Sequence, residues 1–415
     1  MNISKFLILI AVLLQSLSLL AQDDDSLFHI DSFQKINFKA NYDLSSYLNN
    51  SLLGHYFFSG DITQDIKDKN YNRLIAENNP IGNSIDIAFQ YRNNSGELFG
   101  NSKLGYSVAM EWHSLYELAF TQDAFALLFY GNKMFVGKNA NLNNMQVNSL
   151  NYYQIKAGLF HIDRDQQREY GFQLSLNLGN QFSKFGGNNA QLYTDSLGKY
   201  IDLSGTFSNA KSEYLGSNYS NIQGYGSGVD LYYQIGNIDK WQLRFDIQNF
   251  GFIHWNKLSS SYNQTEEIHF EGFEIDNIFN IPDPLTSTNL NDTLSSYLEA
   301  NSTQEAQWTF TPMDVKLNYK YNFNQHWGLS ARVQHRFFSL SKTYFEFGIL
   351  FQVNKRLLVN ANINYGAYAK YNIGIGLQAK INTKFVLEIQ SRFLSGIMTK
   401  SFSGMGAFAQ LNYKI

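Results

Sequence analysis

Residues 35–42 read KINFKANY, and residues 85–92 and 104–113 read IDIAFQYR and LGYSVAMEWH. Apolar and polar residues alternate in all three stretches. In the first stretch Ile36, Phe38, Ala40 and Tyr42 share one face, and Lys35, Asn37, Lys39 and Asn41 share the other. Such alternation predicts β-strands, since successive side chains of a strand point to opposite sides. One side of each strand suits lipid and the other suits water.

The same pattern recurs along the chain. Further strands are predicted near 153–159, 170–178, 229–235, 241–247, 313–321, 327–336, 344–353, 357–366, 369–381, 384–393 and 403–415. The strands are about 9 to 13 residues long, enough to cross a bilayer at a tilt, whereas strands of soluble proteins average about 5 to 6. We therefore predict an all-β fold, an antiparallel transmembrane β-barrel of about 16 strands, with 14 or 18 also open.

The composition agrees with a barrel. Aromatic residues make up 16% of the chain and charged residues only 16%, against roughly 25% charged residues in soluble domains. Yet the mean hydropathy is −0.30, which excludes a bundle of apolar transmembrane helices. A barrel strand turns only every second residue to lipid, so its hydropathy averages out near neutral.

Charge and cysteine content exclude several function classes. The formal net charge is −3 and Lys and Arg are scattered, so no basic surface for nucleic acid is predicted. The chain has no cysteine, which excludes disulfides, thiol catalysis and Cys-based zinc sites. We predict no cofactor.

The N-terminus predicts export. Lys5 precedes an apolar run from Phe6 to Leu14, and Ala21 supplies a small residue before Gln22. This pattern is typical of a signal peptide over residues 1–21. The alternative is an uncleaved anchor, for which the run is short and interrupted. We therefore expect the bacterial outer membrane as the location, with its lipid and the barrel-assembly machinery as partners.

The mature chain divides into a short leading segment and the barrel. Residues 22–33 are predicted to be an N-terminal plug and residues 34–415 the transmembrane barrel. The plug would bring Asp23, Asp24, Asp25 and Asp31 to cations inside the barrel, such as Arg332, Arg336 or Arg392. Opposite charges in a confined lumen attract more strongly than on an open surface.

Two connecting segments predict short helices. Asp61 to Ile75 has apolar residues at near-helical spacing, with Asp61 as N-cap and Gln64 three residues on, which resembles a capping box. Ser287 to Ala300 carries one apolar stripe of an amphipathic helix.

The lengths of the connections predict the orientation. If Ile415 ends on the periplasmic side, counting strands backwards puts the tight turns at 354, 382, 322–325 and 237–239 on that side. The long segments at 131–148 and 180–225 then lie outside, as is usual for outer-membrane barrels. The pattern does not decide whether the stretch 250–275 adds a further hairpin to the barrel.

The polar faces of the strands predict the lining of the lumen. The charged lumen-lining residues predicted in this way are Asp86, Arg92, Glu111, Asp230, Arg244, Asp246, Lys316, Arg332, Arg336, Glu346, Glu388 and Arg392, with Lys320 and Lys380 on the same faces. They form either a wet, charge-lined pore or paired charges that fill a closed barrel. One sequence does not decide between the two.

No motif predicts catalysis. His113, His161, His254, His269 and His335 each fall near a predicted strand end, and none belongs to a catalytic motif. The glycine cluster at 224–228 enters a strand, so phosphate binding is not expected. A barrel enzyme is the least favoured class, and we predict that the chain is not an enzyme.

Several short motifs resemble a known family. They are Asp246–Asn256 (DIQNFGFIHWN), Phe270-Glu271-Gly272, Phe57–Gly60 (FFSG) with Lys67-Asp68 and Asn72-Arg73-Leu74, and the Ala-Gln that ends the signal segment. Together they resemble an outer-membrane barrel family of unknown function from Bacteroidetes-type bacteria, similar in style to long-chain fatty-acid channels. The resemblance implies the location and the barrel, and no functional residues.

Two functions therefore stay open. The first is a channel or transporter for a small solute. The resemblance to fatty-acid channels implies that this solute is hydrophobic. The second is a non-transporting scaffold whose loops at 180–225 and 276–309 bind an envelope or secretion protein. Transport is favoured only by the general habit of barrels.

Overall fold

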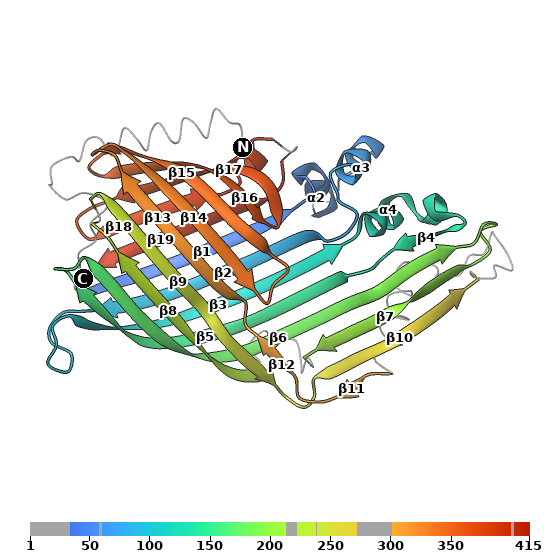
Figure 1. Ribbon diagram of the computed structural model, residues 1–415, viewed down its shortest axis with the longest axis horizontal. Coiled ribbons are helices and arrows are strands. Elements are labelled where there is room, and N and C mark those ends of the chain that lie inside the picture. The colour runs from blue at the N-terminus through green and yellow to red at the C-terminus, as the bar shows by residue number, and fades with distance from the viewer. Residues whose placement is uncertain (1–33, 58–59, 213–221, 238, 272–300, 400–401) are drawn as a thin grey trace.

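The structure is a computed structural model, and it describes residues 34–57, 60–212, 222–237, 239–271, 301–399 and 402–415. Within these ranges fourteen antiparallel strands form a closed ring (Figure 1). In pairing order they are β1 (Gln34–Ser46), β2 (Asn79–Asn93), β3 (Leu104–Phe120), β5 (Met145–Asp163), β6 (Arg168–Thr194), β8 (Gly224–Ile235), β9 (Trp241–Trp255), β13 (Met313–Asn322), β14 (Trp327–Phe337), β15 (Lys342–Asn354), β16 (Leu357–Ala367), β17 (Ala369–Lys380), β18 (Phe385–Ser391) and β19 (Met405–Lys414).

The ring closes between the first strand and the last. β1 pairs with β19 from Lys35↔Lys414 to Leu44↔Met405, and its other side pairs with β2 over thirteen residues. Both backbone edges of β1 are thus hydrogen-bonded. A closed ring leaves no strand edge with unpaired backbone N–H and C=O groups. Such unpaired groups are costly in lipid, where no water can bond to them.

The outer surface of the ring is apolar. Its exposed side chains include Phe38, Phe89, Met110, Ile155, Leu174, Phe347, Ile349, Ile363, Ile373 and Ile389. Aromatic pairs border this surface at the end of the short turns, namely Tyr91–Tyr106, Tyr170–Tyr233, Trp327–Phe351 and Phe385–Tyr413. Others lie at the opposite end, namely Phe252–Trp308, Phe310–Phe338 and Tyr365–Tyr371. An apolar band between two aromatic girdles is the surface that a bilayer matches.

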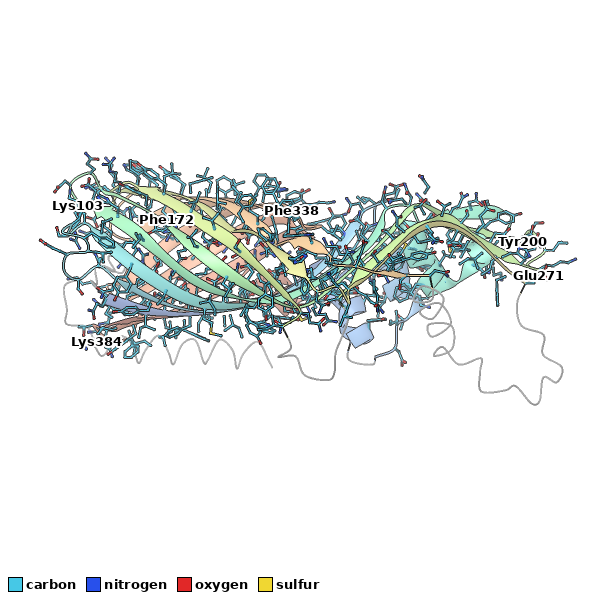
Figure 2. The ribbon with its side chains drawn as sticks, turned by 90° about the horizontal axis from the view of Figure 1, so that it is seen from below. Lys103, Phe172, Tyr200, Glu271, Phe338 and Lys384 are labelled. Atoms are coloured by element: carbon cyan, nitrogen blue, oxygen red, sulfur yellow. The ribbon has the colours of Figure 1, made fainter. Side chains whose placement is uncertain are left out.

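A second sheet extends from one side of the barrel. We call it the side sheet; it consists of residues 183–194 of β6 with β4 (Lys138–Asn141), β7 (Ile201–Lys211), β10 (Ser260–Phe270) and β11 (Thr303–Gln304). β6 belongs to both sheets, since residues 168–179 pair with β8 and residues 183–194 pair with β7. Figures 1 and 2 show the side sheet reaching well beyond the barrel, with Tyr200 and Glu271 at its far end.

An aromatic core fills the fork where the two sheets part. Phe182 and Trp255 pack with ring centroids 4.7 Å apart and are almost fully buried with Ile253. Trp255 donates its indole N–H to Thr309 Oγ1 at 2.9 Å. Thr309 is the middle residue of the short strand β12 (Trp308–Phe310), which pairs with β9. A Cβ on Gly179 would lie 2.6 Å from the Trp255 ring. The close contact of backbone and ring therefore requires glycine at this position.

Helices cover one end of the barrel. α2 (Asn50–Phe57), α3 (Gln64–Tyr71) and α4 (Gln122–Tyr130) share a core of Tyr47, Leu48, Leu52, Leu53, Leu74, Phe120 and Phe125. η1 (Asn132–Phe135) follows α4, and α6 (Leu394–Met398) lies between β18 and β19. Among the described helices, none has the length and apolar character to cross a membrane.

The helix predicted over Asp61 to Ile75 is shorter than expected. It runs from Gln64 to Tyr71, and Thr63 rather than Asp61 is its N-cap, with no capping hydrogen bond from its side chain. Gln64 donates to Asp68 instead of completing a capping box. Thr121 does cap α4, a helix that we did not predict, by accepting from Ala124 N at 3.0 Å.

The number of strands differs from the central estimate of 16. The closed ring has fourteen strands, which are the fourteen that alternation predicted individually, and β7 and β10 pair away from it in the side sheet. The segment 180–225, predicted as a loop, thus contains the end of β6, all of β7 and the start of β8. The stretch 250–275 completes β9 and forms β10, adding nothing to the ring. The signal peptide, the plug segment 22–33 and the helix at 287–300 lie outside the described residues.

The assignment of faces can be tested on β17. Leu377 pairs with Val359 and with the outward Ile389, whereas Gln378 pairs with Glu388, which lines the lumen cavity. Leu377→Arg should destabilise the barrel by about 2 to 4 kcal/mol, the cost of a lipid-facing Arg near the midplane. Gln378→Arg is the matched control and should cost much less. The measurement is unfolding of the lipid-embedded protein in denaturant; equal losses would show that the faces are assigned wrongly.

Candidate functional site: the charged lumen

The inside of the barrel holds a cavity of about 600 Å³. Eleven of the twelve predicted lumen residues line it, namely Asp86, Arg92, Glu111, Asp230, Arg244, Asp246, Lys316, Arg332, Arg336, Glu388 and Arg392. Glu346 does not. It is buried beside a smaller cavity of about 90 Å³ and accepts a hydrogen bond from Tyr344. Lys320 lines both cavities, and Lys380 is buried and lines neither of them.

Lys156 is the centre of the charge network on one wall. Its Nζ lies 2.9 Å from Glu111 Oε2 and 2.7 Å from Asp230 Oδ2, and it donates to Asn249 Oδ1 at 2.9 Å. These partners come from β3, β8 and β9, so the Lys156 side chain of β5 reaches across β6. Its side chain is only 2% exposed. A buried ammonium with three oxygen partners holds the side chains of β3, β8 and β9 in place. Since all three of its donors are used, none is free to bind a solute.

His113 extends this network toward β2. Its Nδ1 lies 2.7 Å from Asp86 Oδ1, and its Nε2 lies 3.1 Å from Glu111 Oε2 and 3.0 Å from Gln154 Oε1. The ring stacks on Tyr152 at 4.8 Å. With oxygen acceptors at both nitrogens, the arrangement suits the imidazolium form, in which both nitrogens donate. We predicted His113 near a strand end, but it lies in the middle of β3 because that strand continues to Phe120.

Three further carboxylates of the lining are held by arginine. Asp314 accepts from both Arg336 Nε and NH2, at 3.0 and 3.1 Å. Asp246 accepts two bonds from Arg244, and Asp43 pairs with Arg392. Paired arginines of this kind are rigid and largely neutralised.

Arg92 makes a longer bridge near the short-turn end. It lies 2.6 Å from Glu169 Oε1 and donates to Tyr232 OH at 3.0 Å. Its guanidinium also lies over the Phe160 ring at 4.1 Å. These contacts join β2 to β6 and β8, neither of which pairs with β2. They therefore stabilise the lining between strands that are not neighbours in the ring.

The lining carries an excess of positive charge. It contains ten Lys and Arg side chains against seven Asp and Glu, although the whole chain is net negative. Glu169, beside the cavity, balances one of them by pairing with Arg92. Lys35, Lys39 and Lys156 belong to this lining but were missing from our prediction. The alternation of β1 and β5 was the signal, since it places all three on the polar face.

The end of the cavity toward the helices is closed by contacts across the ring. Glu117 of β3 accepts hydrogen bonds from the hydroxyls of Ser339 and Tyr368 and from Leu340 N. Ser339 and Leu340 lie between β14 and β15, and Tyr368 lies between β16 and β17, on the opposite side of the ring. We call Glu117, Ser339 and Tyr368 the cross-ring latch. Glu117 is fully buried there, so the latch joins two walls in a dry contact.

The side sheet carries a titratable cluster outside the barrel. His269 of β10 lies 2.5 Å from Asp202 and 3.2 Å from Glu271. The hydrogen bond to Asp202, and then that to Glu271, raise the pKa of His269 above its usual value. The pairing of β7 with β10 therefore includes a charged contact on an exposed surface.

The described residues include no group of three His, Cys, Asp or Glu side chains arranged to hold a metal ion. Most of the charged side chains that gather in the lumen are acids and bases paired with one another. Because Lys and Arg outnumber Asp and Glu in the lining, this arrangement can attract anions and repel cations.

Comparison with known families gives one clear result. The profile described as "Family of unknown function (DUF5723)" matches residues 31–387. No curated protein sequence matches the chain.

Among solved structures, similar folds are outer-membrane channels. The Pseudomonas putida toluene transporter TodX is 10% identical, with 94% of this chain and 91% of that chain covered and a TM-score of 0.42. The Ralstonia pickettii toluene transporter TbuX is 9% identical, with 92% and 89% covered and a TM-score of 0.43. A Pseudomonas aeruginosa FadL homologue is 8% identical, with 93% and 91% covered and a TM-score of 0.43. The likeness is one of general barrel architecture.

The cross-ring latch can be tested by removing one hydroxyl. Tyr368→Phe leaves Glu117 with one donor fewer in a buried place, and we expect a loss of about 1 to 3 kcal/mol in the free energy of unfolding. Tyr371→Phe on β17 is the matched control, because Tyr371 is 73% exposed. Denaturant unfolding followed by tryptophan fluorescence measures both. A loss that is no larger for Tyr368→Phe than for Tyr371→Phe would contradict the latch.

Proposed function

We propose that this chain, which belongs to the family of unknown function DUF5723, is an outer-membrane barrel through which a small solute passes. The observation that carries the proposal is the cavity, lined by polar and charged side chains, inside a closed ring of strands. A ring of this size leaves interior space that side chains do not fill by themselves.

The outer membrane is part of the proposal. The apolar band and the two aromatic girdles support insertion into a bilayer, and closure of the ring meets the backbone requirement there. We further propose that residues 1–21 are removed on export, so that the mature chain begins at or near Gln22. The short turns would then face the periplasm, and the helices and side sheet the outside.

The lining limits the kind of solute. The channels named above transport toluene, according to their titles, but here the cavity wall is charged and hydrogen-bonded. A bare hydrocarbon gains little from contact with charged groups that need water or partners. We propose that a solute of this lumen carries a polar or charged group, even where the rest of the molecule is hydrophobic.

The side sheet supports a second candidate, a scaffold that binds an envelope or secretion protein. The sheet projects beyond the barrel (Figure 2), and it contributes little to closing the ring. Sheets that stand clear of a membrane are available to protein partners. In this candidate the lumen is merely a filled core.

Ion conductance separates the two candidates. The mature protein, inserted in planar lipid bilayers, should give discrete current steps if the lumen is a path. A scaffold with a filled lumen should give none. Swelling of protein-containing liposomes in small uncharged sugars provides a second measure that does not depend on ions. Folded protein that fails both measurements would contradict transport.

The proposed plug is tested by a deletion. Removal of residues 23–32, with the signal junction kept, should leave a folded barrel with raised conductance if these residues obstruct the lumen. Arg336 and Arg392, two of the cations first considered as partners of the plug, are already paired with Asp314 and Asp43. Lys35 and Lys39 are therefore better candidates. Unchanged conductance in the folded deletion variant would place the obstruction elsewhere.

A further inference from the structure

Three lysines of the lumen, Lys35 and Lys39 on β1 and Lys320 on β13, differ from its other cations. Within the ranges that the structure describes, Lys35 and Lys39 form no hydrogen bond and no ion pair through their ammonium groups, yet both line the cavity. Arg92, Lys156, Arg244, Arg336 and Arg392 all have a carboxylate partner within 3.0 Å. Lys35 and Lys39 are thus the cations on β1 whose donors remain available.

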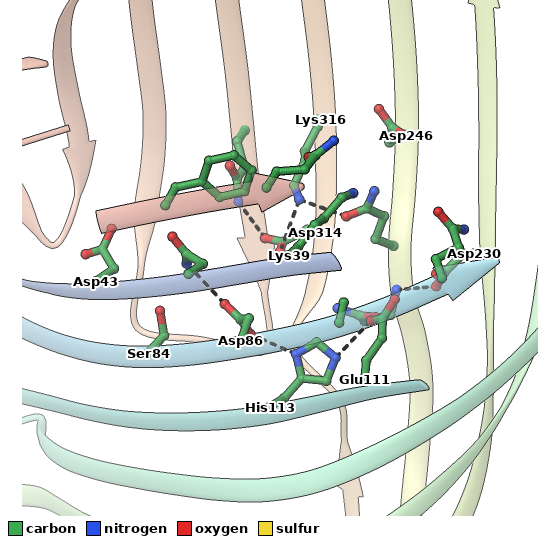
Figure 3. Close-up of a pocket in the computed structure, with 18 of the residues that line it drawn as sticks. Lys39, Asp43, Ser84, Asp86, Glu111, His113, Asp230, Asp246, Asp314 and Lys316 are labelled. Carbon is green, nitrogen blue, oxygen red and sulfur yellow. Dashed lines mark hydrogen bonds and ion pairs between the residues drawn. The ribbon is translucent and has the colours of Figure 1, made fainter. Parts of the chain in front are cut away.

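The two lysines point to the same side of β1. They are four residues apart in a strand, so their Cα atoms are separated by about 13 Å along the same face. β1 lies opposite β9 and β13 in the ring, and those strands contribute Arg244 and Lys316. Arg244 acts electrostatically on both lysines and Lys316 acts on Lys39. Figure 3 shows Lys39 and Lys316 in the same part of the cavity.

The nearby carboxylates do not satisfy these lysines. Glu111, a carboxylate of the same cavity as Lys39, is already bonded to Lys156 and His113. The one that acts on Lys35 is Glu169, which is bonded to Arg92 and Tyr232. Each of these carboxylates is used by a closer partner. Within the described residues, Lys35, Lys39 and Lys320 have no hydrogen-bond or ion-pair partner, and Glu388 is the one carboxylate of the lining without one, so the unpaired charge of the cavity is positive.

We propose that Lys35 and Lys39, with Arg244 and Lys316 opposite, form a binding site for an anionic group, a phosphate or a carboxylate, on a small solute. The inference rests on the proposed function, since it names the class of solute that the lumen selects. Ammonium groups provide up to three donors each, and a multiply charged oxyanion can accept several of them at once. Enclosure within the barrel strengthens the attraction relative to an exposed patch.

The specific contribution of this arrangement is selectivity. A cluster of like charges repels small cations from the cavity and attracts anions into it. The network around Lys156 keeps the acidic side chains of the wall occupied, so they do not compete for the lysines. The lumen should therefore bind oxyanions while it excludes inorganic cations.

The test measures binding, so it is independent of conductance. Isothermal titration of the detergent-purified mature protein with inorganic phosphate and with citrate should give saturable binding, and tetramethylammonium should give none. Lys35→Gln/Lys39→Gln should raise the dissociation constant at least about tenfold, since two charge-assisted contacts are lost. Lys138→Gln/Lys199→Gln is the matched control, with the same loss of two charges from exposed lysines, one on β4 and one in the turn between β6 and β7.

Two further variants keep the outcome clear. Lys39→Arg retains the charge and should keep most of the affinity, which separates charge from a general disturbance of β1. Deletion of residues 23–32 tests whether the chain's own carboxylates occupy the site: binding that appears only after the deletion supports the site and identifies that segment as its occupant. No binding in either the full mature chain or the deletion variant overturns the proposal, as does equal binding by Lys35→Gln/Lys39→Gln. Conductance without anion binding would refute the site alone, while anion binding without conductance would refute transport alone.

Discussion

The backbone hydrogen bonds between β1 and β19 are the constraint on which the rest of the structure depends. The chain must bring residue 35 to residue 414 before any strand at the seam is paired on both sides. A ring closed in this way can place apolar residues on its whole outer surface, because no strand edge there needs water. Every second residue then points inward, which forces polar and charged side chains into one enclosed volume.

That enclosure explains why the lumen is a network rather than a set of separate charges. A buried charge without a partner is costly, and a fully bonded one is tolerated. Lys156 with Glu111 and Asp230, and Asp314 with Arg336, meet this requirement in different walls. Such contacts also brace strands that are not neighbours. Stability and selectivity therefore come from the same residues, and the lysines left over from pairing define what the lumen attracts.

The sequence was sufficient for the alternating faces but not for the ring. Local alternation predicted the strands from β13 to β19 closely, because most of their connections are short and each strand pairs with the next. It missed β7, which lies in a segment predicted as a loop, and it left β10 open, since the place of these strands depends on what β6 pairs with beyond Gly179. The same limit applies to charge pairing. Alternation placed Asp230 and Glu111 inside, but only the three-dimensional arrangement shows that both bind Lys156 across β6.

β6 has a mechanical consequence of its own. A strand of 27 residues would extend about 90 Å if it were straight. β6 runs from the barrel wall into the side sheet with shifts of register beside Asn180 and between Asn188 and Gln191. The aromatic core of Phe182 and Trp255 packs at the first of these shifts, where the two sheets part. The barrel wall next to Asp230 and the side sheet outside the ring therefore share one backbone, and a change in the pairing of either sheet reaches the other through the same strand.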